Sequence, residues 1–281
     1  MVASAFDYVT AASYDEAVGL LASHSEAKIL AGGQSLMPML NLRLAHPELL
    51  IDINPADQRP PSLAGNDLRL PALTRHRVVL EHDLVRRHCP LLSDAMRYVG
   101  NVRVRNRGTI GGSLAHADHT SEIGCCALAT GARVIAHGPN GDRTVAAGDL
   151  FAGYWATTLA ESEIITDVLI PVAGPRQGWS FHEMVRRTSD FAIVAVAVIV
   201  NLAERHGAIA AANIALAGVA DRVVLADPEL VTSDPDETAT RIAESLDPPD
   251  DVHASGEYRR RVARVLIARA FREAHARAAA T

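Results

Sequence analysis

The sequence is poor in cysteine and in aromatic side chains. Its 281 residues include three cysteines, Cys89, Cys125 and Cys126, and only 4% aromatic residues. No CxxC pair is present, and two adjacent thiols cannot easily chelate one metal ion. This spacing argues against an iron–sulfur cluster held by this chain alone. The three thiols are expected to be small buried side chains in a reducing compartment.

Long apolar runs and an excess of basic residues are also missing. The longest apolar stretch, residues 191–200, is too short to span a bilayer. The first seven residues lack a basic segment followed by an apolar one, which argues against a signal peptide. The formal net charge is −6, and the arginines are scattered among acids. We therefore expect a cytoplasmic protein with no transmembrane segment and no nucleic-acid partner.

The composition that remains suits a packed globular protein. Hydrophobic residues make up 48% of the chain and charged residues 21%, which is enough for about two domains. Pro60-Pro61 and the segment Ala173-Gly174-Pro175 are typical of boundaries. These breaks predict a first lobe over residues 1–59, a second lobe over 60–174 and a C-terminal domain over 175–281.

Hydrophobic periodicity predicts the main elements. Ser13 and Glu16 form a capping box that opens a helix, and residues 28–31 read as a buried strand. Residues 191–202 and 208–218 are apolar and predict two antiparallel strands, although an Ala-rich helix competes for part of them. Residues 258–279 alternate Arg with apolar side chains, as in an amphipathic helix. Residues 232–251 are rich in Asp and Pro and are expected to be mobile.

Two short glycine-centred runs carry the strongest functional signal. We expect each run beside a strand, and the first run on a strand-to-helix turn. Without Cβ atoms their backbones can approach a phosphate closely and point N–H groups at its oxygens. Ser and Thr hydroxyls in both runs could add hydrogen bonds. Spacing alone leaves two unrelated turns as an alternative. The runs are Ala31-Gly32-Gly33-Gln34-Ser35 and Thr109-Ile110-Gly111-Gly112-Ser113.

The residues around both runs resemble a known family. Residues 31–38, with Asn41, Arg43 and Leu44, and residues 107–118 resemble two FAD signatures of the medium subunit of the molybdenum hydroxylases. This is the xanthine dehydrogenase and aerobic carbon monoxide dehydrogenase family. Segments 153–159, 163–165 and 186–192 follow in the family's order, so the likeness extends from about residue 6 to about residue 218.

The resemblance implies a fold and a set of site residues. The fold is α+β: a two-lobed FAD-binding domain of the PCMH type, then a smaller C-terminal α+β domain with an antiparallel sheet and helices. Both glycine runs would hold the FAD diphosphate through backbone amides. Glu122 would contact ribose or ribityl hydroxyls, or else be an ordinary acid at a helix start. Ile165 would flank the flavin ring, or else belong to a strand core. No side chain is expected to act as a nucleophile, a general base or a metal ligand.

The resemblance also implies a function within a complex. A large subunit would carry a molybdenum–pterin centre, a small subunit would carry two [2Fe–2S] clusters, and the three chains would form a dimer of heterotrimers. This chain would relay electrons from the clusters through FAD to an external acceptor, while substrate and acceptor stay open. One alternative is a stand-alone FAD-dependent oxidase of the related two-lobed fold; Gln34 stands where a covalent-flavin His would favour it. The other is an assembly protein without flavin, which the intact glycine runs disfavour.

Overall fold

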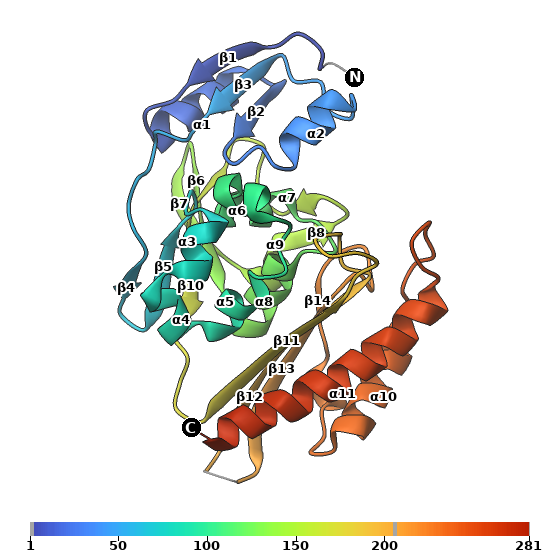
Figure 1. The fold of residues 1–281 in the computed structure, drawn as a ribbon. Helices are drawn as coiled ribbons and strands as arrows, with labels where there is room; N and C mark the ends of the chain where they lie inside the picture. Colours follow the sequence, from blue (N-terminus) through green and yellow to red (C-terminus); the bar gives the residue numbers. More distant parts are fainter. Residues whose placement is uncertain (1–2, 205–206, 281) are drawn as a thin grey trace.

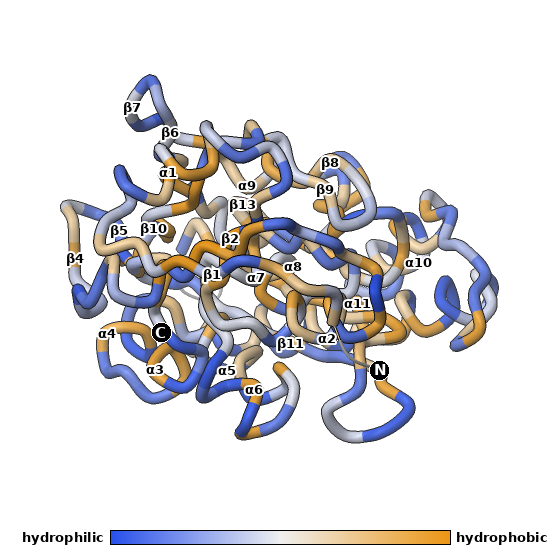
Figure 2. Tube along the Cα trace, turned by 90° about the horizontal axis from the view of Figure 1, so that it is seen from above, coloured by the Kyte–Doolittle hydropathy of each residue, from blue (hydrophilic) through white to orange (hydrophobic). Residues whose placement is uncertain are grey.

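The computed structural model describes residues 3–204 and 207–280 and consists of three parts (Figure 1). Lobe 1 lies at the top of Figure 1, lobe 2 in the middle, and a sheet covered by two helices below. Figure 2, seen from above, places β1 and β2 of lobe 1 over α7 and α8 of lobe 2, in agreement with Figure 1. None of the helices within the described residues is long and apolar enough to cross a membrane.

Lobe 1 is a three-stranded parallel sheet with β3 between β1 and β2. The expected capping box opens its first helix, because the Glu16 amide donates to Ser13 Oγ at 3.1 Å and the Glu16 carboxylate accepts from the Ala12 amide at 2.7 Å. The strand-to-helix turn predicted for the first glycine run is confirmed. The elements are β1 (Asp7–Thr10), α1 (Tyr14–Ser23), β2 (Ala27–Leu30), α2 (Leu36–Asn41) and β3 (Leu49–Asp52).

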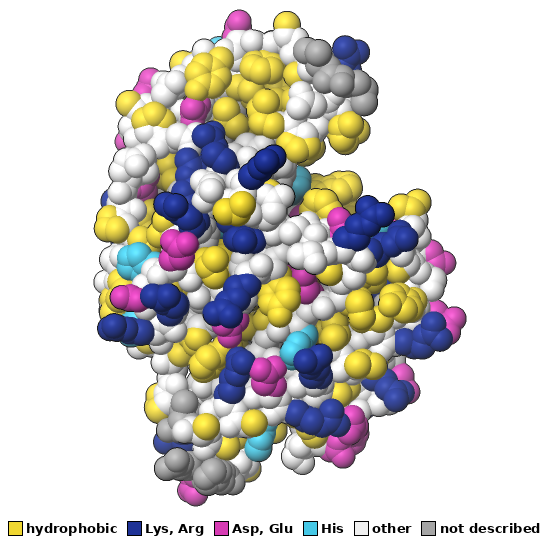
Figure 3. Space-filling model, in the orientation of Figure 1, with side chains coloured by type: hydrophobic (Ala, Val, Ile, Leu, Met, Phe, Trp, Pro, Cys, Tyr) yellow, Lys and Arg dark blue, Asp and Glu magenta, His cyan; other side chains and the backbone are white. Residues whose placement is uncertain are grey.

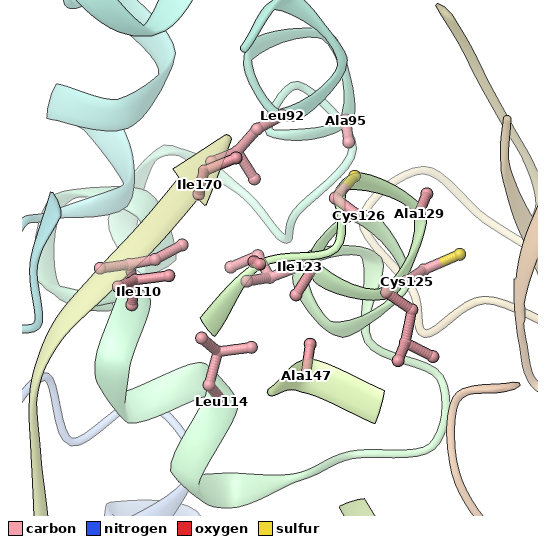
Figure 4. Close-up of a cluster of buried hydrophobic side chains, with 14 of the residues drawn as sticks. Leu92, Ala95, Ile110, Leu114, Ile123, Cys125, Cys126, Ala129, Ala147 and Ile170 are labelled. Atoms are coloured by element: carbon pink, nitrogen blue, oxygen red, sulfur yellow. The ribbon is translucent and has the colours of Figure 1, made fainter. Parts of the chain in front are cut away.

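Lobe 2 packs short helices on a five-stranded antiparallel sheet of order β4-β5-β10-β6-β7. Figure 4 shows its core, which contains Ile110, Leu114, Ile123 and Cys126; the Cys125 thiol points away from them and donates to the carbonyl oxygen of Ala215 at 3.2 Å. All three cysteines are buried and free, and burial raises the pKa of the Cys89 thiol to about 12, so these groups are inert packing residues.

The helices and strands of lobe 2 have the following bounds. The strands are β4 (Ser62–Ala64), β5 (Asp67–Pro71), β6 (Arg133–Gly138), β7 (Gly141–Ala146), β8 (Phe151–Gly153), β9 (Ala156–Thr157) and β10 (Ile164–Pro171). The helices are α3 (His76–Glu81), α4 (Asp83–His88), α5 (Pro90–Ala95), α6 (Val102–Arg107), α7 (Ile110–His116), α8 (Glu122–Thr130) and α9 (Ala147–Leu150).

Ion pairs fix the segment that connects the two lobes. The buried Asp167 carboxylate on β10 accepts two hydrogen bonds from Arg69, at 2.7 and 2.8 Å. Arg59, in the connecting segment, binds the same carboxylate at 3.2 Å and also chelates Asp57. Removing one partner would leave a buried charge uncompensated, so this network holds the connecting segment in a defined place on lobe 2.

The C-terminal domain is a four-stranded antiparallel sheet with two helices on one face (Figure 1). Both expected strands over 191–202 and 208–218 are confirmed as β12 and β13. On β12, Val194, Val196 and Val198 face the core shared with α11, whereas Ala195 and Ala197 face lobe 2. Because both faces of β12 are buried, its sequence is continuously apolar instead of alternating.

The elements of this domain begin with β11, which the sequence analysis did not identify. They are β11 (Gln177–Met184), β12 (Val194–Leu202), β13 (Ile209–Ala217), β14 (Val224–Leu225), the 3₁₀ turn η1 (Pro228–Leu230), α10 (Pro235–Ser245) and α11 (Gly256–Ala280).

The expectation of a mobile segment over residues 232–251 is wrong, because α10 lies within it. Asp234 caps this helix by accepting from the amides of Asp236 and Glu237, at 2.7 and 3.2 Å, and Pro235 occupies its first position. Asp and Pro here are helix-start residues and not signs of disorder. Thr238, Ala239 and other small side chains then bury one face of the helix.

Gly178 on β11 permits close packing of the C-terminal helix. A Cβ at this position would lie 1.8 Å from the carbonyl oxygen of Ala274 on α11. We predict that Gly178→Ala lowers the free energy of unfolding by about 3 kcal/mol. Gly174→Ala is the control, because no atom lies within 4 Å of its Cβ position. Urea denaturation of both variants tests this, and equal stability would contradict the packing described here.

Candidate functional site

The two glycine runs meet where lobe 1 touches lobe 2. A Cβ on Gly32 would lie 2.5 Å from the carbonyl oxygen of Arg107 and 2.8 Å from the Cα of Gly108. The Cβ position of Gly112 is 3.8 Å from the Cβ of Ala31. Backbones from different lobes are therefore in direct contact, and we call this contact region the seam. The structure thus brings the two runs together.

Two polar side chains tie the seam together. Asn54, just after β3, donates from Nδ2 to the carbonyl oxygen of Ala31 at 2.9 Å. The guanidinium group of Arg75 donates both to Asn54 Oδ1 and to the carbonyl oxygen of Arg107. A continuous chain of hydrogen bonds thereby links the first run to the residue that precedes the second. It fixes the distance between the two backbones.

The first run presents unbonded backbone donors. Among the described residues, the amides of Gly32, Gly33, Gln34 and Ser35 donate no backbone hydrogen bond. Gly33 has a φ of 71°, a left-handed conformation that glycine adopts without strain. The Gln34 side chain donates back to the Gly32 carbonyl oxygen at 3.1 Å and accepts no hydrogen bond from these four amides. Successive free amides in such a turn form an anion-binding concavity.

The second run differs from the expectation in two ways. It follows helix α6 and opens α7, so it does not lie beside a strand. Four of its five amides are also already bonded: Ile110 donates to Thr74 at 3.0 Å, Gly111 to Ala72 at 2.9 Å, and Gly112 to Thr109 Oγ1 at 3.2 Å. The amide of Ser113 bonds within the same turn. The amide of Thr109 donates to no other described backbone group, so this one amide and the hydroxyl groups of the run are available to a ligand.

Close packing explains the two glycines of the second run. A Cβ on Gly111 would lie 2.4 Å from the Cβ of Ala72, and one on Gly112 would lie 2.6 Å from Thr109 Oγ1. Gly111 therefore lets α7 settle on the end of β5, and Gly112 leaves room for the cap formed by Thr109. Both are needed for the shape of the seam.

The seam is electropositive. Burial lowers the pKa of the Arg75 guanidinium, and the neighbouring charge of Arg107 lowers it further. Asp52 is the carboxylate that partly offsets these charges. Two cations beside a set of free amides favour an anion, and a phosphate group would relieve their repulsion.

Glu122 lies in the first turn of α8, as expected for an acid at a helix start. Burial raises its pKa to about 7, and Asp118 contributes. Glu183 of β11 faces it from the C-terminal domain: burial and Glu122 together raise the pKa of Glu183 to about 8, and its Oε2 has no partner among the described residues. Acids with raised pKa values that lack partners are typical of functional sites.

Ile165 is buried in β10, with 4% of its surface exposed. The next residue, Thr166, accepts a hydrogen bond from the Ala72 amide at 2.9 Å, and Ala72 packs under Gly111. The structure therefore places Ile165 in the core beneath the second run.

A notch opens beside the seam. Figure 3 shows it between lobe 1 and the lower part of the molecule, with hydrophobic side chains on both walls and arginine or lysine nearby. Large exposed hydrophobic residues occur in lobe 1, in lobe 2 and between β11 and β12, namely Met37, Leu42, Leu44, Tyr154, Trp155 and Phe191. Phe191 is 78% exposed, an unusual state for a Phe that has no ligand or partner to cover it.

Sequence reasoning missed Asn54, Arg75 and His76, all of which touch the glycine runs. None of them belongs to a short motif, since they lie 20 to 40 positions away from the runs that they contact. The sequence near these residues indicates a site only through their place after a strand. Asn54 closely follows β3, and Arg75 and His76 closely follow β5. Among the described residues, no group of three or more His, Cys, Asp or Glu is placed to hold a metal ion.

A seam of free amides and arginines between two lobes is typical of proteins that bind a phosphorylated cofactor. The family described as "FAD binding domain in molybdopterin dehydrogenase" matches residues 4–173, and that described as "CO dehydrogenase flavoprotein C-terminal domain" matches residues 179–274. The chain belongs to the FAD-binding medium subunits of the molybdenum hydroxylase family, and it is an oxidoreductase subunit. The expected α+β fold, an FAD-binding domain followed by a C-terminal domain with an antiparallel sheet, is confirmed.

Relatives match along their full length. The 6-hydroxypseudooxynicotine dehydrogenase complex subunit alpha of Paenarthrobacter nicotinovorans is 36% identical, over 98% of this chain and 96% of that protein. Carbon monoxide dehydrogenase from Hydrogenophaga pseudoflava has a chain that superposes with a TM-score of 0.95 at 32% identity, covering 99% of both. Quinoline 2-oxidoreductase from Pseudomonas putida 86 gives 0.93 at 32% identity, covering 99% of this chain and 100% of that one.

The raised pKa of Glu122 predicts a pH-dependent stability. Between its ordinary value of 4.5 and about 7, the folded chain keeps a proton that the unfolded chain loses, so the free energy of unfolding falls as pH rises through that window. We predict that Glu122→Gln stabilises the flavin-free chain by about 2 kcal/mol at about pH 8 and has little effect near pH 4.5.

The matched control for this prediction is Glu163→Gln. The hydrogen bond and charge of Arg143 lower the pKa of Glu163, which gives the opposite sign: this variant should be less stable than the wild type at about pH 8. Denaturant titrations at both pH values measure each change. A Glu122→Gln effect that does not depend on pH would contradict the assignment.

Proposed function

We propose that this chain carries FAD at the seam and relays electrons within a complex. One-electron inputs would arrive from [2Fe–2S] clusters of a small subunit, and the flavin would pass them to an external acceptor. Substrate oxidation would take place on a molybdenum–pterin centre of a large subunit. Flavin supplies this relay because it exchanges one or two electrons. The observation that carries the proposal is the contact of Gly32 with Arg107 and Gly108, which sets free amides against arginines.

The residues of the chain would then act as binding and orienting groups. The amides of residues 31–35 donate to oxygens of the diphosphate, and Arg75 and Arg107 neutralise its charge. Residues 109–113 form the opposite wall and donate hydroxyls. A Glu122 carboxylate accepts from ribose or ribityl hydroxyls, since it offers two acceptor oxygens. Ile165 supports the flavin ring from the core.

The proposed organisation follows the sheets. Lobe 1 (residues 1–59) and lobe 2 (60–174) enclose the cofactor, and the C-terminal domain (175–281) closes its third side. Two features support this division: each sheet lies wholly within one of these segments, and residues 53–61 connect the first two without a strand or helix.

Relatives with different substrates indicate which subunit selects the substrate. Full-length relatives at 31–36% identity are named as subunits of dehydrogenases for carbon monoxide, glyceraldehyde, caffeine and a nicotine derivative. Because medium chains so similar serve such different reactions, we propose that the large subunit sets the substrate of this complex, which would assemble as a dimer of heterotrimers.

Replacing Gly32 tests the seam. A Cβ at this position would meet the Arg107 carbonyl oxygen, push the two runs apart and misalign the free amides. We expect Gly32→Ala to be purified without the visible absorption bands of oxidised flavin, and Gly148→Ala, whose Cβ position has no neighbour within 4 Å, to keep them. Full flavin content in a folded Gly32→Ala variant would show that the seam is not the flavin site.

Purification of the tagged chain from its native cells tests the relay. We expect two further polypeptides to accompany it, one with molybdenum and one with iron and labile sulfide. A flavin-loaded chain that is isolated alone and oxidises a substrate directly would instead support the stand-alone oxidase.

A further inference from the structure

His76 lies directly under the second glycine run. It is the first residue of α3 and is 3% exposed. Its amide donates to the carbonyl oxygen of Gly108 at 3.0 Å, and its ring fills the space where a Cβ of Gly108 would lie, 2.6 Å from Cε1. The ring is therefore locked in one orientation by the backbone that it supports.

The contacts of the ring determine where its proton sits. Nε2 lies 3.0 Å from the carbonyl oxygen of Thr109 and 3.0 Å from Ser113 Oγ. A carbonyl oxygen only accepts, so Nε2 carries the proton. Nδ1 is buried without a partner among the described residues, as suits the unprotonated nitrogen. Burial lowers the pKa of His76 to about 4, which keeps the ring neutral.

This tautomer fixes the direction of the Ser113 hydroxyl. A protonated Nε2 has no lone pair, so the Ser113 O–H cannot donate to it and must point elsewhere. Ser113 Oγ can only share the Nε2 proton as an acceptor, beside the carbonyl oxygen of Thr109. The described residues contain no other hydrogen-bond partner for this hydroxyl group. Ser113 is half-buried and follows Gly112, which faces Ala31 across the seam.

We propose that His76 is a positioning residue that holds the Ser113 hydroxyl as a donor to a phosphate oxygen of the bound dinucleotide. The inference rests on the proposed function. It explains how the second run contributes although four of its five amides are bonded inside the protein. A hydroxyl group that is held as a donor favours a ligand with an anionic acceptor at this position over a ligand with a donor group.

A double-mutant cycle on the full chain tests this. FAD affinity is measured by quenching of flavin fluorescence for His76→Phe, Ser113→Ala and the double variant. Phe keeps the ring against Gly108 but donates no hydrogen bond. We expect each single variant to bind FAD about tenfold more weakly, since one hydrogen bond to a charged group is lost. The double variant should bind no more weakly than Ser113→Ala alone, because both changes remove the same donor.

His76→Gln is the conservative variant. Its Nε2 can donate to the same oxygens, so we expect FAD affinity within about threefold of the wild type. Multiplicative losses in the double variant would overturn the proposal and leave His76 a purely structural residue. Equal losses for His76→Gln and His76→Phe would do the same.

Nitrogen NMR of the wild-type ring keeps the test independent of folding. A proton on Nε2 supports the proposal even if His76→Phe does not fold, and a proton on Nδ1 overturns it. A folded wild-type chain that takes up no FAD would overturn the proposed function itself, whereas normal uptake with an additive cycle overturns only the role of His76.

Discussion

The site depends on one backbone contact that a side chain would forbid. Gly32 of lobe 1 lies against Arg107 and Gly108 of lobe 2 so closely that a Cβ would fall within 2.5 Å of a carbonyl oxygen. This approach places the free amides of the first run opposite the hydroxyls of the second. Asn54 and Arg75 then lock the distance with hydrogen bonds from both lobes. Without the contact there would be two turns and no shared site.

The candidate site brings together charges and unbonded polar groups that a bound anionic ligand would stabilise. Arg75 and Arg107 repel each other at the seam. Burial disfavours ionisation of Glu122 and Glu183, and the neighbouring charges of Asp118 and of Glu122, respectively, add to this effect. Unbonded amides and an exposed Phe191 add to the cost. A group that is anionic at one place, rich in hydroxyls at another and aromatic at its end would satisfy all of them, and FAD has that order of chemical parts.

The C-terminal domain serves the site by its position. The strand β12 is buried on both faces, against α11 on one side and lobe 2 on the other. That double burial fixes β11 beside it, and β11 brings Glu183 to Glu122. In the proposed organisation, the third part of the chain thus completes a site that its first two parts begin.

By itself, the sequence determined the local chemistry: the capped start of α1, the strand-to-helix turn at Gly32 and Gly33, the apolar strands β12 and β13, and the family to which the glycine runs belong. These features depend on neighbours within a few positions. The prediction from sequence failed where the same composition is typical of two different structures. Asp and Pro residues occur both in mobile segments and at helix starts, and here they start α10.

Only the tertiary structure decided which donors are free. The amides of Ile110 and Gly111 are bonded to Thr74 and Ala72, and the Ser113 hydroxyl lies 3.0 Å from His76 Nε2, all of them contacts between residues distant in sequence. Backbone amides look alike in any sequence, and their availability depends on which acceptors the fold brings to them.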